Sequence, residues 1–233
     1  MAFFLPSTLE LLPKYYAASE EYLPTCAHPG EDAGADLKAY IPKEVDEAAL
    51  SALLQTTYSA WRKSDCELSH SLVINGKYPE RGPTHAWSAN NSHLIAAAID
   101  ALPNKRLVVI HPGQTVKISA GFKIALPDLS EHGPYVPVYK IMSRSGLAIN
   151  HGIKVVNVPG IIDAGYRDWV VIGLWNTSDK VHIFTDGAKI AQGLYEVVVD
   201  QSRFDKKDTL VSEEEFNKLS SSRGQGGLGH TGI

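Results

Sequence analysis

The chain has 233 residues, of which 44% are hydrophobic and 21% are charged, and its formal net charge at pH 7 is −4. This balance is ordinary for a globular protein with one sizeable core, and it argues against a nucleic-acid scaffold, which is usually basic. Only two cysteines are present, Cys26 and Cys66, so the sequence predicts neither a disulfide framework nor a structural zinc site, and a reducing cytoplasmic setting is expected.

The start of the chain has an apolar patch but lacks the basic residues of a signal peptide, and no apolar run reaches membrane-spanning length. Two segments are predicted to be helical. Residues 44–63 repeat their apolar positions with helical spacing, and residues 92–102 form a shorter pattern that stops before a proline. Residues 64–91, between the two, are polar, rich in turn formers and without clear periodicity.

From residue 106 the pattern changes to short apolar runs separated by Gly, Pro, Asp and Asn, which favours an all-β barrel or sandwich. After Val199 the chain turns polar and ends in a Gly-rich stretch. That ending cannot offset its ordering entropy by burying apolar area, so we expect a mobile arm. The first predicted strands are 106–110, 115–118, 122–125 and 136–141.

Residues 157–167 form a turn-rich segment between two further predicted strands, 153–156 and 169–175. The sequence predicts a tight hairpin that points a carboxylate, a phenol and an amide the same way. These groups belong to Asp163, Tyr166 and Asn157. Taken singly, each is equally consistent with a turn former or a core residue.

Two short motifs precede this hairpin. Asp36 ends the segment Asp-Ala-Gly-Ala-Asp and is either a solvated strand residue or an acid near a divalent ion, held through water. The segment Ser143-Arg144-Ser145-Gly146 combines a cation, a hydroxyl and a glycine, which suits an anion. It is also consistent with a helix start capped by Ser143 or Ser145, and the two interpretations are compatible.

Two motifs follow the hairpin. Gln192 is the one amide on an apolar strand that begins after Gly187, and alone it is a weak signal. The C-terminal Arg223-Gly-Gln-Gly-Gly-Leu-Gly satisfies a dinucleotide fingerprint, but no strand precedes it and no helix can follow. Two interpretations of this segment remain: a disordered linker, or a phosphate-directed tail framed by Arg223 and Thr231.

In this order the five segments resemble the five signature motifs of the trimeric dUTPase family, over about residues 23–45 and from 106 to the C-terminus. The resemblance implies an all-β jelly-roll or β-barrel subunit in a homotrimer, with active sites built from several chains. It also implies hydrolysis of dUTP to dUMP and pyrophosphate with Mg²⁺ bound. On this basis one domain spans 1–233, with a helical insertion at 46–105 and a mobile arm at 200–233.

The resemblance also implies a role for each matching residue. Asp163 is expected to activate the attacking water, and Asp36 to hold metal-bound water. Tyr166 is expected to stack under the deoxyribose, and Arg223 to close on the terminal phosphate. The remaining substrate-binding positions are Arg144, Ser145, Gly146 and Gln192 for the phosphates, Asn157, Gly160 and Ile162 for uracil, and Gly227, Leu228 and Gly229 in the tail.

Two other functions compete with this one. A dCTP deaminase of the same fold resembles this chain, but it would carry a catalytic glutamate after the hairpin, where residues 170–176 contain no acid. Alternatively, the chain is a dUTP-binding regulatory protein that acts through the insertion 46–105 on a protein partner. For the insertion, the preferred interpretation is a packing elaboration on the outside of a trimer.

Overall fold

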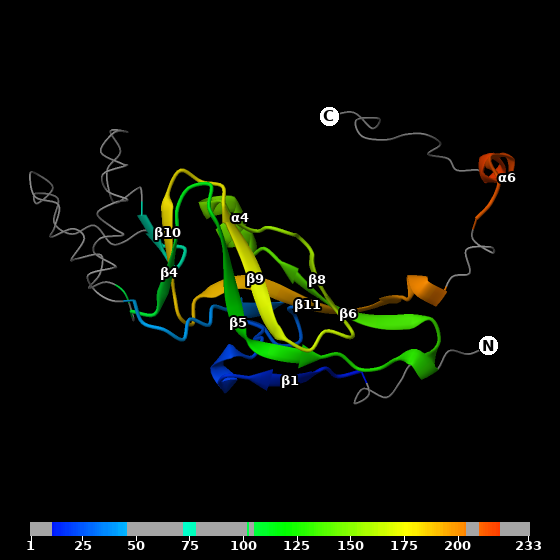
Figure 1. The fold of residues 1–233 in the computed structure, drawn as a ribbon, viewed down its shortest axis with the longest axis horizontal. Helices are drawn as coiled ribbons and strands as arrows, with labels where there is room; N and C mark the ends of the chain where they lie inside the picture. Colours follow the sequence, from blue (N-terminus) through cyan, green and yellow to red (C-terminus); the bar gives the residue numbers. More distant parts are fainter. Residues whose placement is uncertain (1–10, 46–71, 78–101, 103–104, 204–209, 220–233) are drawn as a thin grey trace, which may run out of the picture. The chain divides into compact units, whose positions relative to one another are not determined.

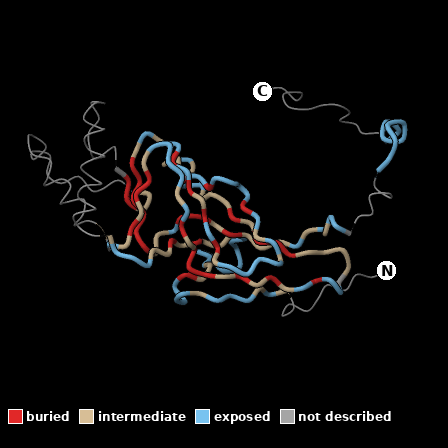
Figure 2. The backbone as a smooth tube through the Cα atoms, in the orientation of Figure 1, coloured by how far each residue is buried: buried red, intermediate tan, exposed pale blue. Residues whose placement is uncertain are grey.

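The computed structural model describes residues 11–45, 72–77, 102, 105–203 and 210–219. The chain divides into two compact units, Met1–Val198 and Val199–Ile233. Strands dominate the first unit, so the prediction of an all-β fold is confirmed (Figure 1). The second unit contains the short helix α6, Glu213–Lys218, which is exposed along its whole length (Figure 2).

Two four-stranded sheets form the body of the first unit. One has the order β1-β5-β9-β7 and the other the order β2-β11-β6-β8. The strands of the first sheet are β1 (Lys14–Ala17), β5 (Thr115–Ala125), β9 (Trp169–Asn176) and β7 (Ile153–Val155). The strands of the second sheet are β2 (Ala35–Lys38), β11 (Lys189–Val199), β6 (Tyr135–Met142) and β8 (Gly160–Asp163).

A third sheet has three strands in the order β3-β10-β4. Its strands are β3 (Leu72–Ile74), β10 (Val181–Thr185) and β4 (Leu107–Ile110). One α-helix, α4 (Ser145–His151), lies between β6 and β7, and it ends at Gly152 in the left-handed conformation that favours glycine. The short 3-10 helices are η1 (Glu20–Tyr22), η2 (Ser130–His132) and η3 (Gln201–Arg203).

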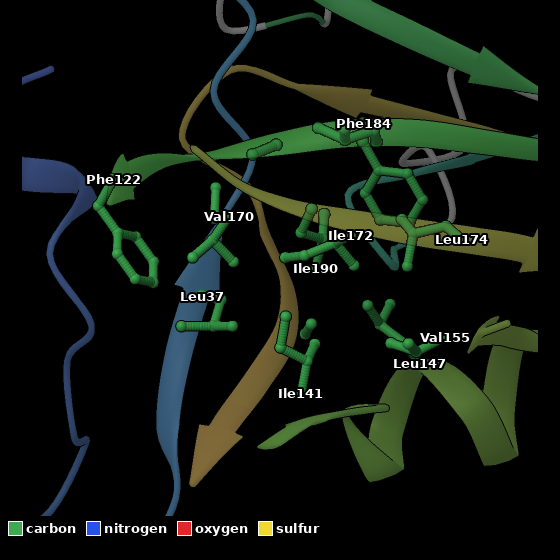
Figure 3. Close-up of a cluster of buried hydrophobic side chains, with 14 of the residues drawn as sticks. Leu37, Phe122, Ile141, Leu147, Val155, Val170, Ile172, Leu174, Phe184 and Ile190 are labelled. Carbon is green, nitrogen blue, oxygen red and sulfur yellow. The ribbon is translucent and has the colours of Figure 1, made fainter. Parts of the chain in front are cut away.

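The core is formed by the side chains on one face of each strand, where buried and exposed residues alternate. Along β9, the inward side chains of Val170, Ile172 and Leu174 are all at most 1% exposed, and their neighbours are half-buried or exposed. This period of two is the pattern of a strand with one face against a core. Figure 3 shows these side chains facing Leu37 of β2 and Ile190 of β11, so the core lies between the two four-stranded sheets.

The two strands predicted at 115–118 and 122–125 form one long strand, β5. The pairing of β5 with β9 shifts register between Ser119 and Lys123, and Gly121 lies in this irregular stretch with φ 76°. A methyl group at Gly121 would come within 2.8 Å of the Tyr22 ring. Glycine therefore allows both the bend and the close approach of Tyr22, and it accounts for the interrupted apolar pattern.

The segment predicted as a single tight hairpin is organised differently. The flanking strands do pair, since Val155 of β7 lies opposite Leu174 of β9. Between them, however, the chain leaves this sheet, and β8 pairs with β6 of the other sheet, with Asp163 opposite Val138. The hairpin prediction is therefore wrong in this respect: β8 gains backbone partners on β6 instead of closing a short loop.

One further prediction is wrong, and one segment without a predicted element contains a strand. The residue before helix α4 is Arg144, so neither Ser143 nor Ser145 is its N-cap; the Ser143 Oγ accepts a hydrogen bond of 2.9 Å from the Val155 N–H instead. The segment 64–91, which showed no periodicity, contains β3. The helices predicted at 44–63 and 92–102 lie almost entirely outside the described residues.

The two ends of the predicted insertion meet. The Val45 N–H donates to the Lys105 carbonyl oxygen over 2.9 Å. Beside this contact, the buried carboxylate of Asp186 accepts a 2.7 Å hydrogen bond from the Tyr22 hydroxyl and forms a 2.7 Å ion pair with Arg106. The Ile41 N–H donates to the other carboxylate oxygen over 2.8 Å. These contacts of Asp186, which we call the Asp186 clamp, hold together residues on both sides of the predicted insertion.

Candidate active site

The carboxylate of Asp36 lies at the centre of a cluster of charges. Its Oδ1 is 2.8 Å from the Arg144 Nε, and its Oδ2 is 2.7 Å from the Lys189 Nζ. The Arg144 guanidinium also donates to the Lys189 carbonyl oxygen over 3.1 Å. The Asp36 side chain is only 16% exposed, so water screens these ion pairs less than it does pairs on the surface. Three segments far apart in the sequence therefore meet here.

Gln192 lies beside this cluster of charges. It lies directly opposite Asp36 in the pairing of β11 with β2. A methyl group at Gly34 would lie 3.7 Å from the Gln192 Oε1, so the amide extends beside the glycine turn that leads into β2. The structure thus brings together Asp36, Arg144 and Gln192, which were predicted as separate motifs.

Helix α4 begins beside this cluster. Arg144 is its N-cap, with φ −72° and ψ 128°, and its side chain makes no capping hydrogen bond to the helix. Ser145 and Gly146 are exposed, and no described atom lies within 4 Å of the position that a side chain at Gly146 would take. The start of α4 is consequently open to a ligand, with a hydroxyl and backbone N–H groups next to the arginine.

Asp163 ends strand β8 and is exposed. A turn follows it, in which the Tyr166 N–H donates to the Asp163 carbonyl oxygen over 3.0 Å. The Tyr166 hydroxyl donates to the Trp169 carbonyl oxygen over 2.7 Å, and this bond holds the ring beside the turn. Partial burial, followed by the charge of Asp168, raises the pKa of Tyr166, so its hydroxyl remains a neutral donor.

Gly160 is the first residue of β8, and Asn157 lies in the turn that precedes this strand. A methyl group at Gly160 would come to 3.4 Å from the amide of exposed Asn157 and from the Ile141 Cβ, so glycine lets these groups approach closely. Strand β8 ends the sheet order β2-β11-β6-β8 and has one neighbour among the described strands. Its other edge, which includes the backbone of Ile162, is therefore not paired with a described strand.

Asp36 and Asp163 lie on opposite edges of the same four-stranded sheet, because β2 and β8 are its outer strands. Three strand spacings of about 4.8 Å separate the two edges by roughly 14 Å. The cluster around Asp36 and the turn after Asp163 are therefore separate places within the chain. The predicted tail residues Arg223, Gly227, Leu228 and Gly229 lie outside the described residues.

Lys189 is a member of the charge cluster that the sequence did not single out. It lies in the segment Gly187-Ala-Lys-Ile-Ala-Gln192, three residues before the amide that was chosen. The Lys189 side chain contacts the Asp36 carboxylate directly, whereas Gln192 is placed beside it by the pairing of β11 with β2. A lysine at the start of a strand after a glycine turn is the signal that could have identified it.

Within the described ranges, no three His, Cys, Asp or Glu side chains lie together as a metal-binding group. None of the described helices is long and apolar enough to cross a membrane.

Comparisons with known proteins show the family to which this chain is related. The family model described as dUTPase matches residues 88–232, more than half of the chain. A deoxyuridine 5'-triphosphate nucleotidohydrolase from Desulfotalea psychrophila is 40% identical over 139 residues, which cover 60% of this chain and 79% of that protein. Another, from Rickettsia massiliae, is 34% identical over 160 residues, or 69% of this chain and 91% of that protein.

A solved structure supports the same fold. The dUTPase of Staphylococcus bacteriophage 80alpha, solved as a mutant with dUpNHpp, aligns with a TM-score of 0.52. The alignment covers 95% of this chain and 99% of that chain at 16% sequence identity, so it speaks for the fold alone. Together with the match to the family model and the meeting of three signature motifs around Asp36, these findings identify the chain as a member of the dUTPase family.

Proposed function

We propose that this protein hydrolyses dUTP to dUMP and pyrophosphate, a proposal supported by relatives that are named deoxyuridine 5'-triphosphate nucleotidohydrolases. The observation that carries the proposal is the meeting of Asp36, Arg144 and Gln192 beside the exposed start of α4. Cations, an amide and the backbone N–H groups of a helix start are the donors that a triphosphate requires.

Asp163 is the base in this proposal. Its carboxylate accepts a proton from a water molecule, whose oxygen attacks the α-phosphorus in line with the bond to the bridging oxygen. A new bond from this oxygen to the α-phosphorus forms, the bridging bond breaks, and pyrophosphate leaves. The exposure of Asp163 at the end of a paired strand supports this role, because the backbone is fixed while the carboxylate remains accessible.

The phosphates bind to the start of α4 and to the cluster next to it. The Arg144 guanidinium, the Ser145 hydroxyl, the Gly146 N–H and the Gln192 amide neutralise or hydrogen-bond the phosphate oxygens. Lys189 adds a second cation. We assign the closing contacts to the tail, with Arg223 on the terminal phosphate and Gly227, Leu228 and Gly229 over the nucleotide, so that bulk water is excluded while the attacking water remains.

Mg²⁺ is the cofactor that fits this set of donors. It prefers phosphate oxygens, retains several waters and needs few carboxylates, so Asp36 alone is sufficient on the protein side. When bound, the ion supplies neutralisation of the triphosphate charge. Asp36 itself holds Arg144 and Lys189 together, and its remaining lone pairs are the protein acceptors that would hold a hydrated ion.

We assign recognition of the base to strand β8 and recognition of the sugar to the turn that follows it. The edge of β8 that pairs with no described strand, near Gly160 and Ile162, offers backbone donors and acceptors to the uracil edge, and the Asn157 amide adds to them. Cytosine presents the opposite donor and acceptor pattern, so it would leave buried polar groups unpaired. The Tyr166 ring, held by its bond to Trp169, fills the space that a ribose 2′-hydroxyl would need.

We further infer that the active site is shared between subunits of a homotrimer in the cytoplasm. The separation of Asp36 and Asp163 across one sheet supports this, because a second copy can bring its own turn to the charge cluster. Exposed apolar side chains on and beside the first sheet support it too: Val156, Val171 and Trp175 are 52%, 46% and 44% exposed. Such a patch is typical of an interface.

One assay tests the proposed function. Pyrophosphate release is measured from dUTP, dCTP, dTTP and UTP, each with and without Mg²⁺. We expect release from dUTP alone and only with the ion present. Release of ammonia from dCTP would instead support the deaminase, and binding of dUTP without turnover would support a regulatory protein. A protein partner for 46–105 stays a prediction, since most of that segment lies outside the described residues.

A further inference from the structure

A short piece of the insertion belongs to the β fold. Strand β3 runs parallel to β10, with Val73 opposite His182 and Ile74 opposite Ile183. Val73 is fully buried and Ile74 is 9% exposed. This segment is therefore packed as a core strand, and its removal would uncover the side chains of β10.

Asn75 fixes the turn that follows β3. Its backbone N–H donates to the Ile183 carbonyl oxygen over 2.9 Å. Its side chain makes two bonds to buried Thr185: the Nδ2 donates to the Thr185 Oγ1 over 2.8 Å, and the Oδ1 accepts from the Thr185 N–H over 2.9 Å. Asn75 also has φ 49°, a conformation that asparagine tolerates better than most residues. The turn is thus locked onto the end of β10.

The same turn contacts helix α4. A methyl group at Gly76 would lie 2.9 Å from the Leu147 Cδ2, and Leu147 is only 4% exposed. The His151 ring, at the other end of α4, is hydrogen-bonded with the Gly76 backbone. Leu147, near the start of α4, and His151, at its end, therefore both contact the turn of the insertion. Leu147 directly follows Ser145 and Gly146 in the sequence.

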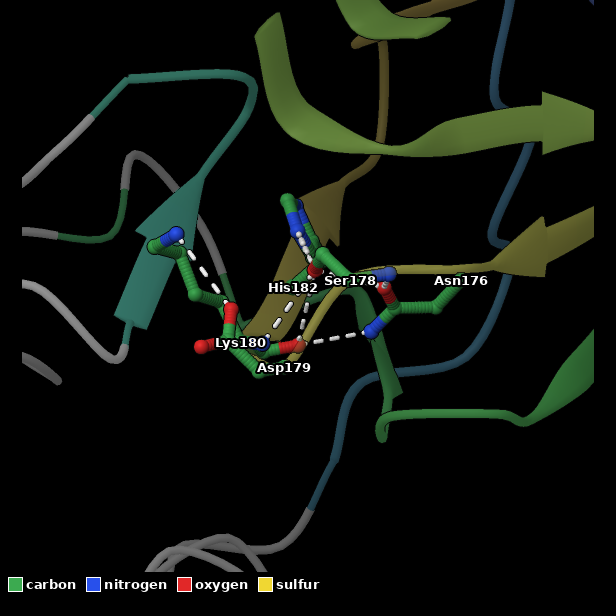
Figure 4. Close-up of polar contacts among 5 residues, drawn as sticks. All are labelled: Asn176, Ser178, Asp179, Lys180 and His182. Carbon is green, nitrogen blue, oxygen red and sulfur yellow. Dashed lines mark hydrogen bonds and ion pairs between the residues drawn. The ribbon is translucent and has the colours of Figure 1, made fainter.

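Strand β10 is itself firmly anchored. The buried Asn176 donates through its Nδ2 to the Ile110 and Lys180 carbonyl oxygens over 3.0 and 2.6 Å. Its Oδ1 accepts from the Ser178 hydroxyl, which lies 3.2 Å from the His182 Nε2 (Figure 4). These contacts hold the loop that leads into β10, so the turn at Asn75 is supported by a fixed neighbour.

We propose that Asn75 is a positioning residue for triphosphate binding: it holds the insertion's turn against α4, and thereby places the phosphate-binding start of that helix. The proposal rests on the proposed function, since it assigns the phosphates to Ser145 and Gly146. Asn75 acts through Leu147 and His151 and touches no phosphate. The insertion then has a role in the reaction, in addition to any role on the protein surface.

The test compares a triphosphate with a monophosphate. Dissociation constants of dUpNHpp and dUMP are measured by titration calorimetry with Mg²⁺ on the full chain and on Asn75→Gly, which accepts the positive φ but removes both side-chain bonds. Because small displacements of a binding group weaken its contacts steeply, dUpNHpp affinity should fall about tenfold and dUMP affinity by less than about twofold. Lys77→Ala, at an exposed position in the same turn, should change neither.

Gly76→Ala provides a second measurement that keeps the Asn75 bonds and presses a methyl group onto Leu147. It should produce the same selective loss, whereas Asn75→Asp should retain wild-type selectivity because the Thr185 hydroxyl can donate to the carboxylate. Equal weakening of both ligands in the two disruptive variants, or wild-type affinity for dUpNHpp, would overturn the positioning role. Failure of the unmodified protein to bind dUpNHpp would instead refute the proposed function.

Discussion

The Asp36 carboxylate and the Arg144 guanidinium form an ion pair of 2.8 Å although 108 positions separate them in the sequence. Asp36 comes from β2 and Arg144 precedes α4, so the contact joins an outer strand of the second four-stranded sheet to the helix whose start we propose to bind the phosphates. Lys189 completes the cluster on the second carboxylate oxygen. Two cations are thereby held next to each other before any ligand binds.

Replacement of this carboxylate tests the cluster. In Asp36→Asn, the amide cannot neutralise Arg144 and Lys189, so both side chains lose their fixed positions. We expect kcat/KM for dUTP to fall on the order of 10- to 100-fold, because phosphate contacts require preorganised groups. The Mg²⁺ concentration for half-maximal activity should also rise. Asp32→Asn, on an exposed acid of the same motif, is the control and should leave both quantities near the wild-type values.

Replacement of Asp186, whose contacts join the two sides of the predicted insertion, should lower the stability of the protein. Asp186→Ala removes a buried carboxylate that Tyr22, Ile41 and Arg106 contact, and it leaves donors without their acceptor. The free energy of unfolding should decrease by about 3 kcal/mol, which urea denaturation measures. Asp179→Ala, at a side chain that is 84% exposed, should change it by less than about 0.5 kcal/mol. Equal effects of the two variants would contradict the clamp.

Because the His182 ring is buried, we expect the stability of the protein to depend on pH. Burial, followed by the nearby His151, lowers the pKa of His182 from 6.5 to about 4. Between these values the unfolded chain binds a proton that the native state does not, so the stability present above pH 6.5 is lost as the pH falls towards 4. The total loss is about 3 kcal/mol.

His182→Phe removes this titration, while an aromatic ring still faces Phe184, on which His182 is stacked. Urea unfolding at several pH values should show a shallower slope between pH 6.5 and 4 than in the wild type. The exposed His28 provides the control, and His28→Phe should retain the wild-type slope. An unchanged slope in His182→Phe would mean that other groups cause the dependence.

The tail gives a prediction about turnover. A chain that ends after Ser222 lacks Arg223 and the Gly-rich segment, which we assign to the closed state over the nucleotide. Its kcat should fall by about 100-fold or more, while its unfolding midpoint in urea stays within error of the wild type. A chain that lacks only Ile233 should retain activity. Full turnover by the shorter chain would exclude a role for the tail in the reaction.

Local sequence pattern was sufficient for much of the fold. The strand predicted at 169–175 is β9, because alternating Val, Ile and Leu residues reflect one buried face. Gly121 broke the pattern of β5 into two because its own position is a bend within a single strand. Short local signals of this kind locate strands well, but they place their ends and interruptions less well.

Pairings between distant segments could not be predicted in this way. β3 has three residues and no visible period, and it is a strand because β10 supplies its partners. Likewise, β8 is not part of the predicted hairpin because β6, a strand of the other sheet, supplies its partners. For the site, the separate motifs were visible in the sequence, but their assembly followed from the family resemblance, and Lys189 was identified only from its contact with Asp36.

The most direct test of the account is the reaction of Asp163→Asn. This variant keeps the shape of the side chain at the end of β8 and removes the base. Pyrophosphate release from dUTP should fall by about 100- to 10,000-fold, the range expected for the loss of a general base, while the dissociation constant for dUpNHpp stays within about threefold of the wild-type value. Turnover near the wild-type rate with intact binding would contradict the claim that this carboxylate activates the attacking water.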